Sequence, residues 1–320
     1  MQVGYIIKRI GSTLVTIFLV FSFDFYLFRI LPGDPFALLF RGVNLTAEQM
    51  ENLRAQFGLD QSLWVQYLVY LKNSASGNFG ISYQTRVPVA ELVFPALMNT
   101  VILLLTATVI AICAGIMIGM IAAWRRGTKV EVAMSGTTLL LYCMPTFWLG
   151  LMLMIIGVIY LGLPVSSMSS VMIQAGVLPH FVDLLRHMAL PLATLVLGLT
   201  GQYVLVMKGA LLNVLTEDYM VTARAKGISK SKLMWDHGFR NAILPMVTLM
   251  ALNIGLSFGG AIQTETIFSW PGIGLLIYNA ILARDYPILQ GCFLVIAVAV
   301  IFANLIADLI YPLVDPRVTS

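Results

Sequence analysis

Apolar residues along the chain gather into six long runs separated by more polar segments. A helix needs about 20 mainly apolar residues to cross the hydrocarbon core of a bilayer, and each run reaches about that length. The pattern therefore predicts an all-α membrane protein with six transmembrane helices, over about residues 10–31, 99–123, 133–161, 188–208, 243–267 and 288–313. Gln202 interrupts the fourth run, and Asn253, Gln263 and Glu265 dilute the fifth.

The longest polar segment, residues 32–98, carries helical signals of its own. Thr46 stands three positions before Gln49, a capping-box arrangement that starts a helix. A second helix is expected from Gln61 to about Lys72, where apolar residues share one face. Glycine and proline break the remainder into turns. We interpret this segment as a small structured cap outside the membrane.

A second polar segment, residues 209–242, is the most charged part of the chain. Met220, Ala223 and Gly227 nevertheless follow one another at helical spacing. This spacing predicts a short amphipathic helix that ends near the glycine.

Composition agrees with a membrane protein, because 59% of the residues are hydrophobic and only 11% are charged, whereas soluble domains carry about a quarter charged residues. The net charge is +4, but the basic residues lie between apolar runs rather than in one block, which argues against nucleic acid as a partner. With the N-terminus inside, the cytoplasmic segments hold twelve of the 19 Lys and Arg residues and the outer segments six. This bias predicts that both termini are cytoplasmic.

The sequence lacks the motifs of membrane or nucleotide chemistry. It contains no G-x-x-x-x-G-K-[ST] loop to cradle ATP and no H-E-x-x-H zinc motif. A dyad of Ser169 or Ser170 with His187 can be drawn, but a histidine that meets water and backbone at the membrane edge explains the pattern better. We therefore expect no catalytic, cofactor-binding or metal-binding residue in this chain.

Ionisable groups inside membrane spans cost about 2.5–3.5 kcal/mol on insertion scales, so each is a functional candidate. Asp24 lies in the first span, where it could pair loosely with Arg29, face another helix or line a wet path. The fifth span carries Asn253, Ser257 and Gln263, whose side chains suit either pore lining or close helix packing. These four polar residues are the candidates for a translocation path.

The charged segment 209–242 contains the most specific motif, E-D-Y-M-V-T-A-R-A-K-G over residues 217–227, followed by Ile243-Leu244-Pro245. It resembles the loop by which permease subunits of ABC importers contact their ATPases, in the D-Y-x-x-T-A-R-A-K-G form of the dipeptide, oligopeptide and nickel permease family. The I-L-P element comes later than the general importer spacing, as it does in that family. The resemblance assigns a coupling role to Glu217, Asp218, Tyr219, Thr222, Ala223, Arg224, Ala225, Lys226 and Gly227.

Other stretches resemble the same family in the same order. They are L-P-G-D-P at 31–35, G-L-D-Q-S-L-W-V-Q-Y at 58–67 with G-N-F-G at 77–80, W-P-G-I-G at 270–274 with R-D-Y-P at 284–287, and D-P at 315–316. Each motif is weak alone, but together they extend the resemblance over nearly the whole chain.

The resemblance implies a type I ABC importer permease of the B type in the cell (inner or plasma) membrane. It implies four kinds of partner: a second homologous permease, two ATP-binding subunits or domains that hold ATP and magnesium, an extracytoplasmic binding protein and the lipid bilayer. The binding protein would dock on residues 32–98 and 268–287, and small residues at 223, 225 and 227 would lodge in a groove on the ATPase. Peptides are the expected substrates, with nickel or oligosaccharides as alternatives. An ATP-independent secondary transporter and an intramembrane enzyme are the rival classes.

Overall fold

The computed structural model describes residues 3–30, 61–170 and 176–314, and within them helices are joined by turns and one isolated bridge between Ile81 and Pro88. The helix expected after Thr46 lies outside the described residues. In chain order the elements are α1 (Val3–Ile30), α4 (Leu63–Ala75), α5 (Val89–Trp124), α6 (Lys129–Cys143), α7 (Thr146–Ile156), η1 (Gly157–Leu161), α8 (Val177–Leu215), α9 (Asp218–Ala225), α10 (Lys230–Lys232), η2 (Leu233–Phe239), α11 (Arg240–Ile267), α12 (Ile273–Ala283) and α13 (Tyr286–Val314).

Four of the described helices, α1, α5, α8 and α13, are long and apolar enough to cross a membrane. A fifth span is counted if the pair formed by α6 and α7 with η1 is taken together, although the pair bends by 106°. The bend falls at Met144-Pro145, inside the predicted run 133–161, so that run is not one straight helix. Proline lacks an N–H and disfavours helical backbone in the residue before it, and Met144 is accordingly extended (ψ 136°). The predicted run 243–267 lies within α11, which is not among these five.

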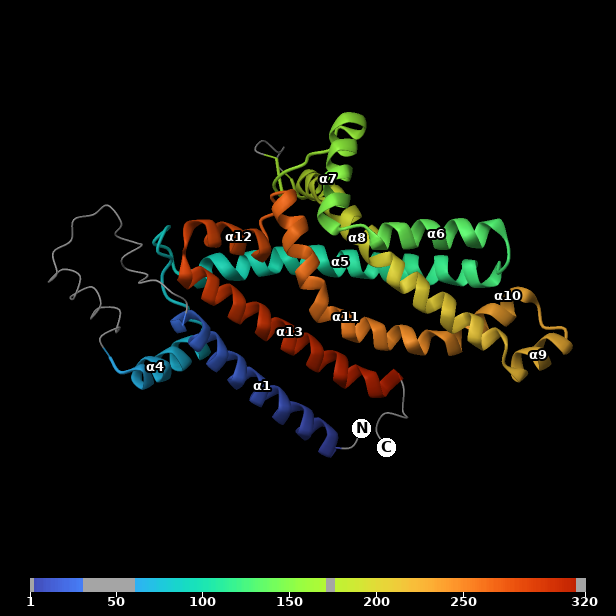
Figure 1. Ribbon diagram of the computed structural model, residues 1–320, viewed down its shortest axis with the longest axis horizontal. Coiled ribbons are helices and arrows are strands. Elements are labelled where there is room, and N and C mark those ends of the chain that lie inside the picture. The colour runs from blue at the N-terminus through green and yellow to red at the C-terminus, as the bar shows by residue number, and fades with distance from the viewer. Residues whose placement is uncertain (1–2, 31–60, 171–175, 315–320) are drawn as a thin grey trace.

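The long helices lie roughly along one axis of the molecule (Figure 1). Helix α8 packs most extensively on α5 and also contacts α6, α7 and α11, while α13 contacts α1, α5, α11 and α12. Helices α4 and α12 lie toward one end and α9 and α10 toward the other, while the N-terminal end of α1 and the C-terminal end of α13 lie near the middle of the long axis (Figure 1). The short charged helices are therefore far from the segment that contains α4.

Small residues on α5 allow its close contact with α8. The buried positions recur every four residues, at Ala107, Ala111, Gly115, Gly119 and Ala123. A Cβ atom added at Gly115 would lie 2.3 Å from Tyr203 Cβ, and one at Gly119 would lie 2.8 Å from Met207 Cβ. In lipid, helices associate through van der Waals packing rather than the hydrophobic effect, so this close approach stabilises the bundle.

Two fully buried carboxylates hold the turns on either side of α12. Glu265 accepts hydrogen bonds from Thr100 Oγ1 (2.6 Å) and from the Gly274 N–H (2.7 Å) in the first turn of α12. Asp285 accepts from Ser82 Oγ (2.6 Å) and from the Ile288 N–H (3.4 Å) at the start of α13. Both acids bond free N–H groups at a helix N-terminus, where the helix dipole also favours a negative group.

Replacing Glu265 by alanine is expected to destabilise the chain by about 3 kcal/mol, because the buried Thr100 hydroxyl and Gly274 N–H would lose their acceptor. Thr100→Val removes the donor to Glu265 and also the acceptor of the buried Ile273 N–H (2.8 Å), so it should cost a similar amount. The double variant should then unfold close to the Glu265→Ala variant, since the two changes are coupled. Thermal unfolding in mild detergent tests this, and strictly additive effects would refute a shared network.

Candidate functional site

The predicted coupling segment folds as α9, a helix of eight residues from Asp218 to Ala225. The helix follows an extended Glu217 and carries Asp218 in its first turn and Arg224 in its last. Acidic groups near the N-terminus and basic groups near the C-terminus both complement the helix dipole. The local sequence therefore supports a short helix that would be marginal in isolation.

One face of α9 is fixed to the rest of the chain. Met220 and Ala223 are buried together with Leu233 of η2, and Trp124, Val214, Leu215 and Ile228 pack around them. These neighbours come from the ends of α5 and α8 and from the turn after α9. Helix α9 is therefore anchored on the ends of α5 and α8 as well as on η2.

Gly227 ends the helix with a Schellman arrangement. The Gly227 N–H donates to the Arg224 carbonyl (3.0 Å), and the Ile228 N–H donates to the Ala223 carbonyl (3.4 Å). Gly227 has a φ of 73°, which glycine adopts without the cost that a side chain would add. Ile228 then packs beside Ala223 in the cluster under α9, so the glycine sets the direction in which the chain leaves the helix.

The other face of α9 is exposed. Among the residues assigned to coupling, Ala223 alone is buried, at 6% exposure. It packs within this chain and is not available to a partner. The expected surface of small residues at 223, 225 and 227 therefore lacks its first member. The exposed members are Glu217, Asp218, Tyr219, Thr222, Arg224, Ala225, Lys226 and Gly227.

Sequence reasoning missed two large side chains that α9 exposes. Val221 is 59% exposed and Tyr219 is 42% exposed, and because they are two positions apart they lie on opposite flanks of the helix. Trp235 of η2, an element in contact with α9, is 49% exposed. Apolar residues within the most charged segment of the chain were the available signal. Burial and the nearby Glu217 carboxylate raise the pKa of Tyr219, so its hydroxyl stays protonated at neutral pH.

The candidate translocation residues do not form one cluster. Asp24 is buried and accepts a hydrogen bond from Tyr70 of α4 (2.7 Å), while the Arg29 guanidinium lies 5.5 Å above the Phe25 ring. Gln263 is exposed on α11. The side chains of Asn253 and Ser257 lie outside the described residues.

The groups considered for catalysis have other partners. Ser170 Oγ donates to Asp183 (2.6 Å), and Nδ1 of His187 lies 2.9 Å from the Asp183 carbonyl, so both residues are held by Asp183 rather than by each other. Across the described ranges, no three His, Cys, Asp or Glu side chains are grouped to hold a metal ion.

These features define a class: a helical multi-pass membrane protein in which one charged segment presents a short helix, anchored on one face and exposed on the other. The chain belongs to the family described as "Binding-protein-dependent transport system inner membrane component", which matches residues 115–320, and the corresponding N-terminal family matches residues 2–104. It is therefore a multi-pass protein of the cell membrane.

Full-length relatives agree with the family match. The chain is 36% identical over 334 residues to the dipeptide transport system permease protein DppB of Escherichia coli (strain K12), covering 98% of each chain. It is 36% identical over 337 residues to the di/tripeptide transport system permease protein DppB of Pseudomonas aeruginosa (strain UCBPP-PA14), covering 99% of each. It is 32% identical over 317 residues to the oligopeptide transport system permease protein AppB of Bacillus subtilis (strain 168), covering 98% of this chain and 99% of the relative.

Proposed function

We propose that this chain is a permease subunit of an ATP-driven peptide importer and forms half of its translocation path. The observation that carries the proposal is α9, a short helix with its inner face packed against α5, α8 and η2 and its outer face free for a partner. Relatives whose names specify dipeptide, di/tripeptide and oligopeptide transport support peptides over nickel or oligosaccharides as the cargo.

The proposed topology has six spans with both termini in the cytoplasm, as in type I ABC importer permeases. Helix α11 is proposed as the remaining span, although it is not among the helices that length and apolar composition identify as membrane spans. Residues 32–98 then lie outside as a cap and residues 209–242 lie in the cytoplasm. The N-terminal part of α1 and the C-terminal part of α13 lie together, with Arg9 Nη1 3.0 Å from Asp308 Oδ2, which supports placing both termini on one side of the membrane.

The proposed assembly contains a second homologous permease, two ATP-binding subunits or domains and an extracytoplasmic binding protein that docks on residues 32–98 and 268–287. ATP and magnesium are held by the ATPases, and this chain holds no cofactor. Closure of the ATPases would push on α9, and its packing would tilt the spans to open one side of the path. The exposed Gln263, with Asn253 and Ser257 on the same helix, is proposed to line that path. The hydrogen bond of Asp24 to Tyr70 supports a role in holding α4 in place.

Affinity purification of the tagged chain in mild detergent, followed by reconstitution, tests the proposal. We expect a second permease and ATP-binding subunits to co-purify, and labelled dipeptide uptake into proteoliposomes to require ATP and the binding protein. Uptake of nickel or of an oligosaccharide in place of peptide would change the assigned substrate and leave the rest of the proposal intact. Uptake by this chain without ATP would support a secondary transporter and overturn the proposal.

The exposed Val221 of α9 gives a sharper prediction. Val221→Asp places a charge at a position that is 59% exposed, so the chain should still fold. Desolvating that charge against an ATPase should reduce co-purification of the ATP-binding subunit about tenfold. Val221→Ile keeps the surface apolar and should retain the subunit. Equal recovery with both variants would exclude this face as the contact.

A further inference from the structure

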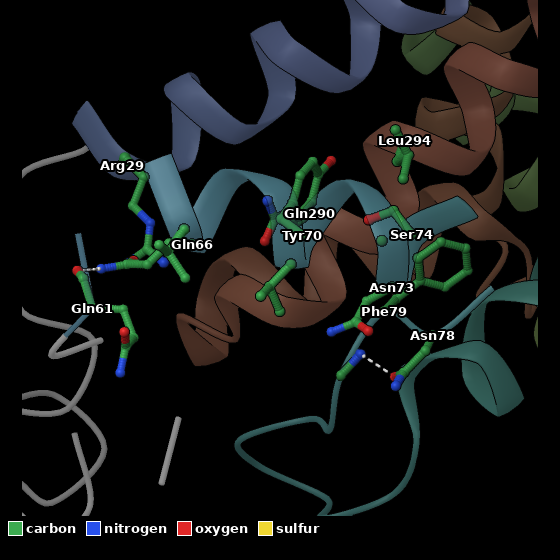
Figure 2. A pocket seen from close by; sticks show the side chains of 14 residues that line it. Arg29, Gln61, Gln66, Tyr70, Asn73, Ser74, Asn78, Phe79, Gln290 and Leu294 are labelled. Carbon is green, nitrogen blue, oxygen red and sulfur yellow. Dashed lines mark hydrogen bonds between the residues drawn. The ribbon is translucent and has the colours of Figure 1, made fainter. Parts of the chain in front are cut away.

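A polar pocket of about 240 Å³ lies where α1, α4 and α13 meet. Arg29, Gln61 and Gln66 gather toward one end of it, and Tyr70 and Gln290 lie between that end and the opposite wall (Figure 2). Among the described residues that line it, Arg29 carries the one formal charge; the Asp24 carboxylate lies behind the wall, where it accepts a hydrogen bond from Tyr70 (2.7 Å) and is also bonded to Gln290. The pocket therefore offers a guanidinium and several amide groups to a ligand with a negative charge and further hydrogen-bonding atoms.

An apolar groove of about 340 Å³ continues from this pocket. The two cavities share Ser74, Phe79 and Leu294 as lining residues. Beyond them the groove is walled by apolar side chains of α1, α5 and α13, namely Phe21, Phe94, Leu97, Val295, Val298 and Ala299. The combined site is thus polar at one end and apolar at the other.

The helices that form the site set its depth in the membrane. Arg29 is the last residue of the apolar span Gly4–Arg29, and Gln290 lies in the first turn or so of the span Tyr286–Leu309, so the polar pocket lies at a membrane boundary. Phe21 precedes Arg29 by eight residues, which corresponds to about 12 Å along a helix. The groove therefore extends into one leaflet of a hydrocarbon core about 30 Å thick.

Helix α4 extends the same boundary along the surface. Trp64 and Leu68 are 66% and 48% exposed, although neither belongs to the translocation path proposed above. Tryptophan and tyrosine are enriched at the level of the lipid headgroups, and an amphipathic helix can lie there with its apolar face toward the acyl chains. The exposed face of α4 thus continues the lipid-facing surface beside the pocket.

We infer that this composite site binds a glycerophospholipid of the leaflet that α4 faces. The phosphodiester lies at the Arg29 guanidinium, the glycerol and headgroup oxygens lie among the amide side chains, and one acyl chain follows the groove toward Ala299. A peptide would leave the groove unexplained, because the groove opens at the depth of the hydrocarbon core. The site depends on membrane insertion and is independent of the cargo of the importer.

Native mass spectrometry of the full chain, purified with its partner subunits in mild detergent, tests the inference. We expect one phospholipid to remain on the wild-type complex and its retention to fall about tenfold in Arg29→Gln, which removes the charged hydrogen bonds. Arg186→Gln is the matched control, because it removes an exposed arginine of α8 that does not line either cavity. Ala299→Phe fills the groove without touching the polar pocket and should also release the lipid.

Complexes reloaded in nanodiscs of phosphatidylglycerol should regain the lipid, whereas sodium phosphate alone should not displace it. Equal lipid retention in Arg29→Gln and Arg186→Gln would overturn the site. Displacement by phosphate together with an unaffected Ala299→Phe variant would reduce it to an anion pocket and also refute the inference. If Arg29→Gln fails size-exclusion chromatography, Ala299→Phe alone decides the result. Loss of peptide transport without loss of lipid would bear on the proposed function only.

Discussion

Replacing Gly115 by alanine is expected to destabilise the chain by about 3 kcal/mol or more, although the change adds a single methyl group. The new Cβ would lie 2.3 Å from Tyr203 Cβ and 3.2 Å from the Tyr203 carbonyl carbon. These atoms belong to the backbone of α8 or lie next to it, so no rotamer change relieves the overlap. The two helices would have to separate, and the buried side chains of Tyr203 and Met207 would lose their close packing.

Gly198→Ala provides the matched control within α8. Its Cβ would meet no atom within 4 Å, so the expected effect is neutral or a gain of about 0.5–1 kcal/mol from better helix propensity. Both variants are compared as purified chains by the fraction that stays monodisperse after heating in detergent. Equal unfolding temperatures would mean that α5 and α8 are further apart than the structure places them.

Hydrophobic runs predicted where the long helices lie but not where they begin or turn. The run 99–123 covers only the later part of α5, which starts at Val89 and continues through Glu91 and Pro95, two residues that hydropathy does not favour inside a span. The corner at Pro145 falls within a run that is apolar on both sides, so hydropathy alone does not mark it. Hydropathy indicates whether a segment lies in lipid or in water, whereas the positions where a helix begins and ends depend on backbone hydrogen bonds.

Residues whose roles depend on a distant segment could not be assigned from their own neighbourhood. Glu265 looked like a polar dilution of a span, yet its two partners are Thr100, on a different helix, and the first turn of α12. Gly115 acquires its importance only opposite Tyr203. The motif of residues 217–227 predicted a short helix that ends near the glycine, but only the packing under α9 shows that Ala223 belongs to its inner face.

Replacing Gly227 by valine is expected to abolish most peptide transport, by about tenfold or more, while the chain remains folded. A left-handed backbone costs a residue with a Cβ roughly 1–2 kcal/mol, and a β-branched residue at the φ of 73° is a stronger outlier. The added Cβ would meet nothing within 4 Å, so no clash spreads into the bundle. The strain is relieved locally by opening the bonds that join Gly227 to Arg224 and Ile228 to Ala223.

Once these two hydrogen bonds are broken, the C-terminal end of α9 would no longer be held against the bundle, and its contact with the ATPase would become flexible. Gly227→Asn is the control, because asparagine tolerates the left-handed conformation and should retain most of the transport. ATP-dependent uptake of a labelled dipeptide is measured with the partner subunits present, beside ATP hydrolysis. Hydrolysis that continues in the valine variant while uptake stops would locate the defect in mechanical coupling. Wild-type uptake in the valine variant would refute the need for a rigid end of α9. Equal losses in the valine and asparagine variants would mean that any added side chain is harmful, whatever backbone geometry it permits.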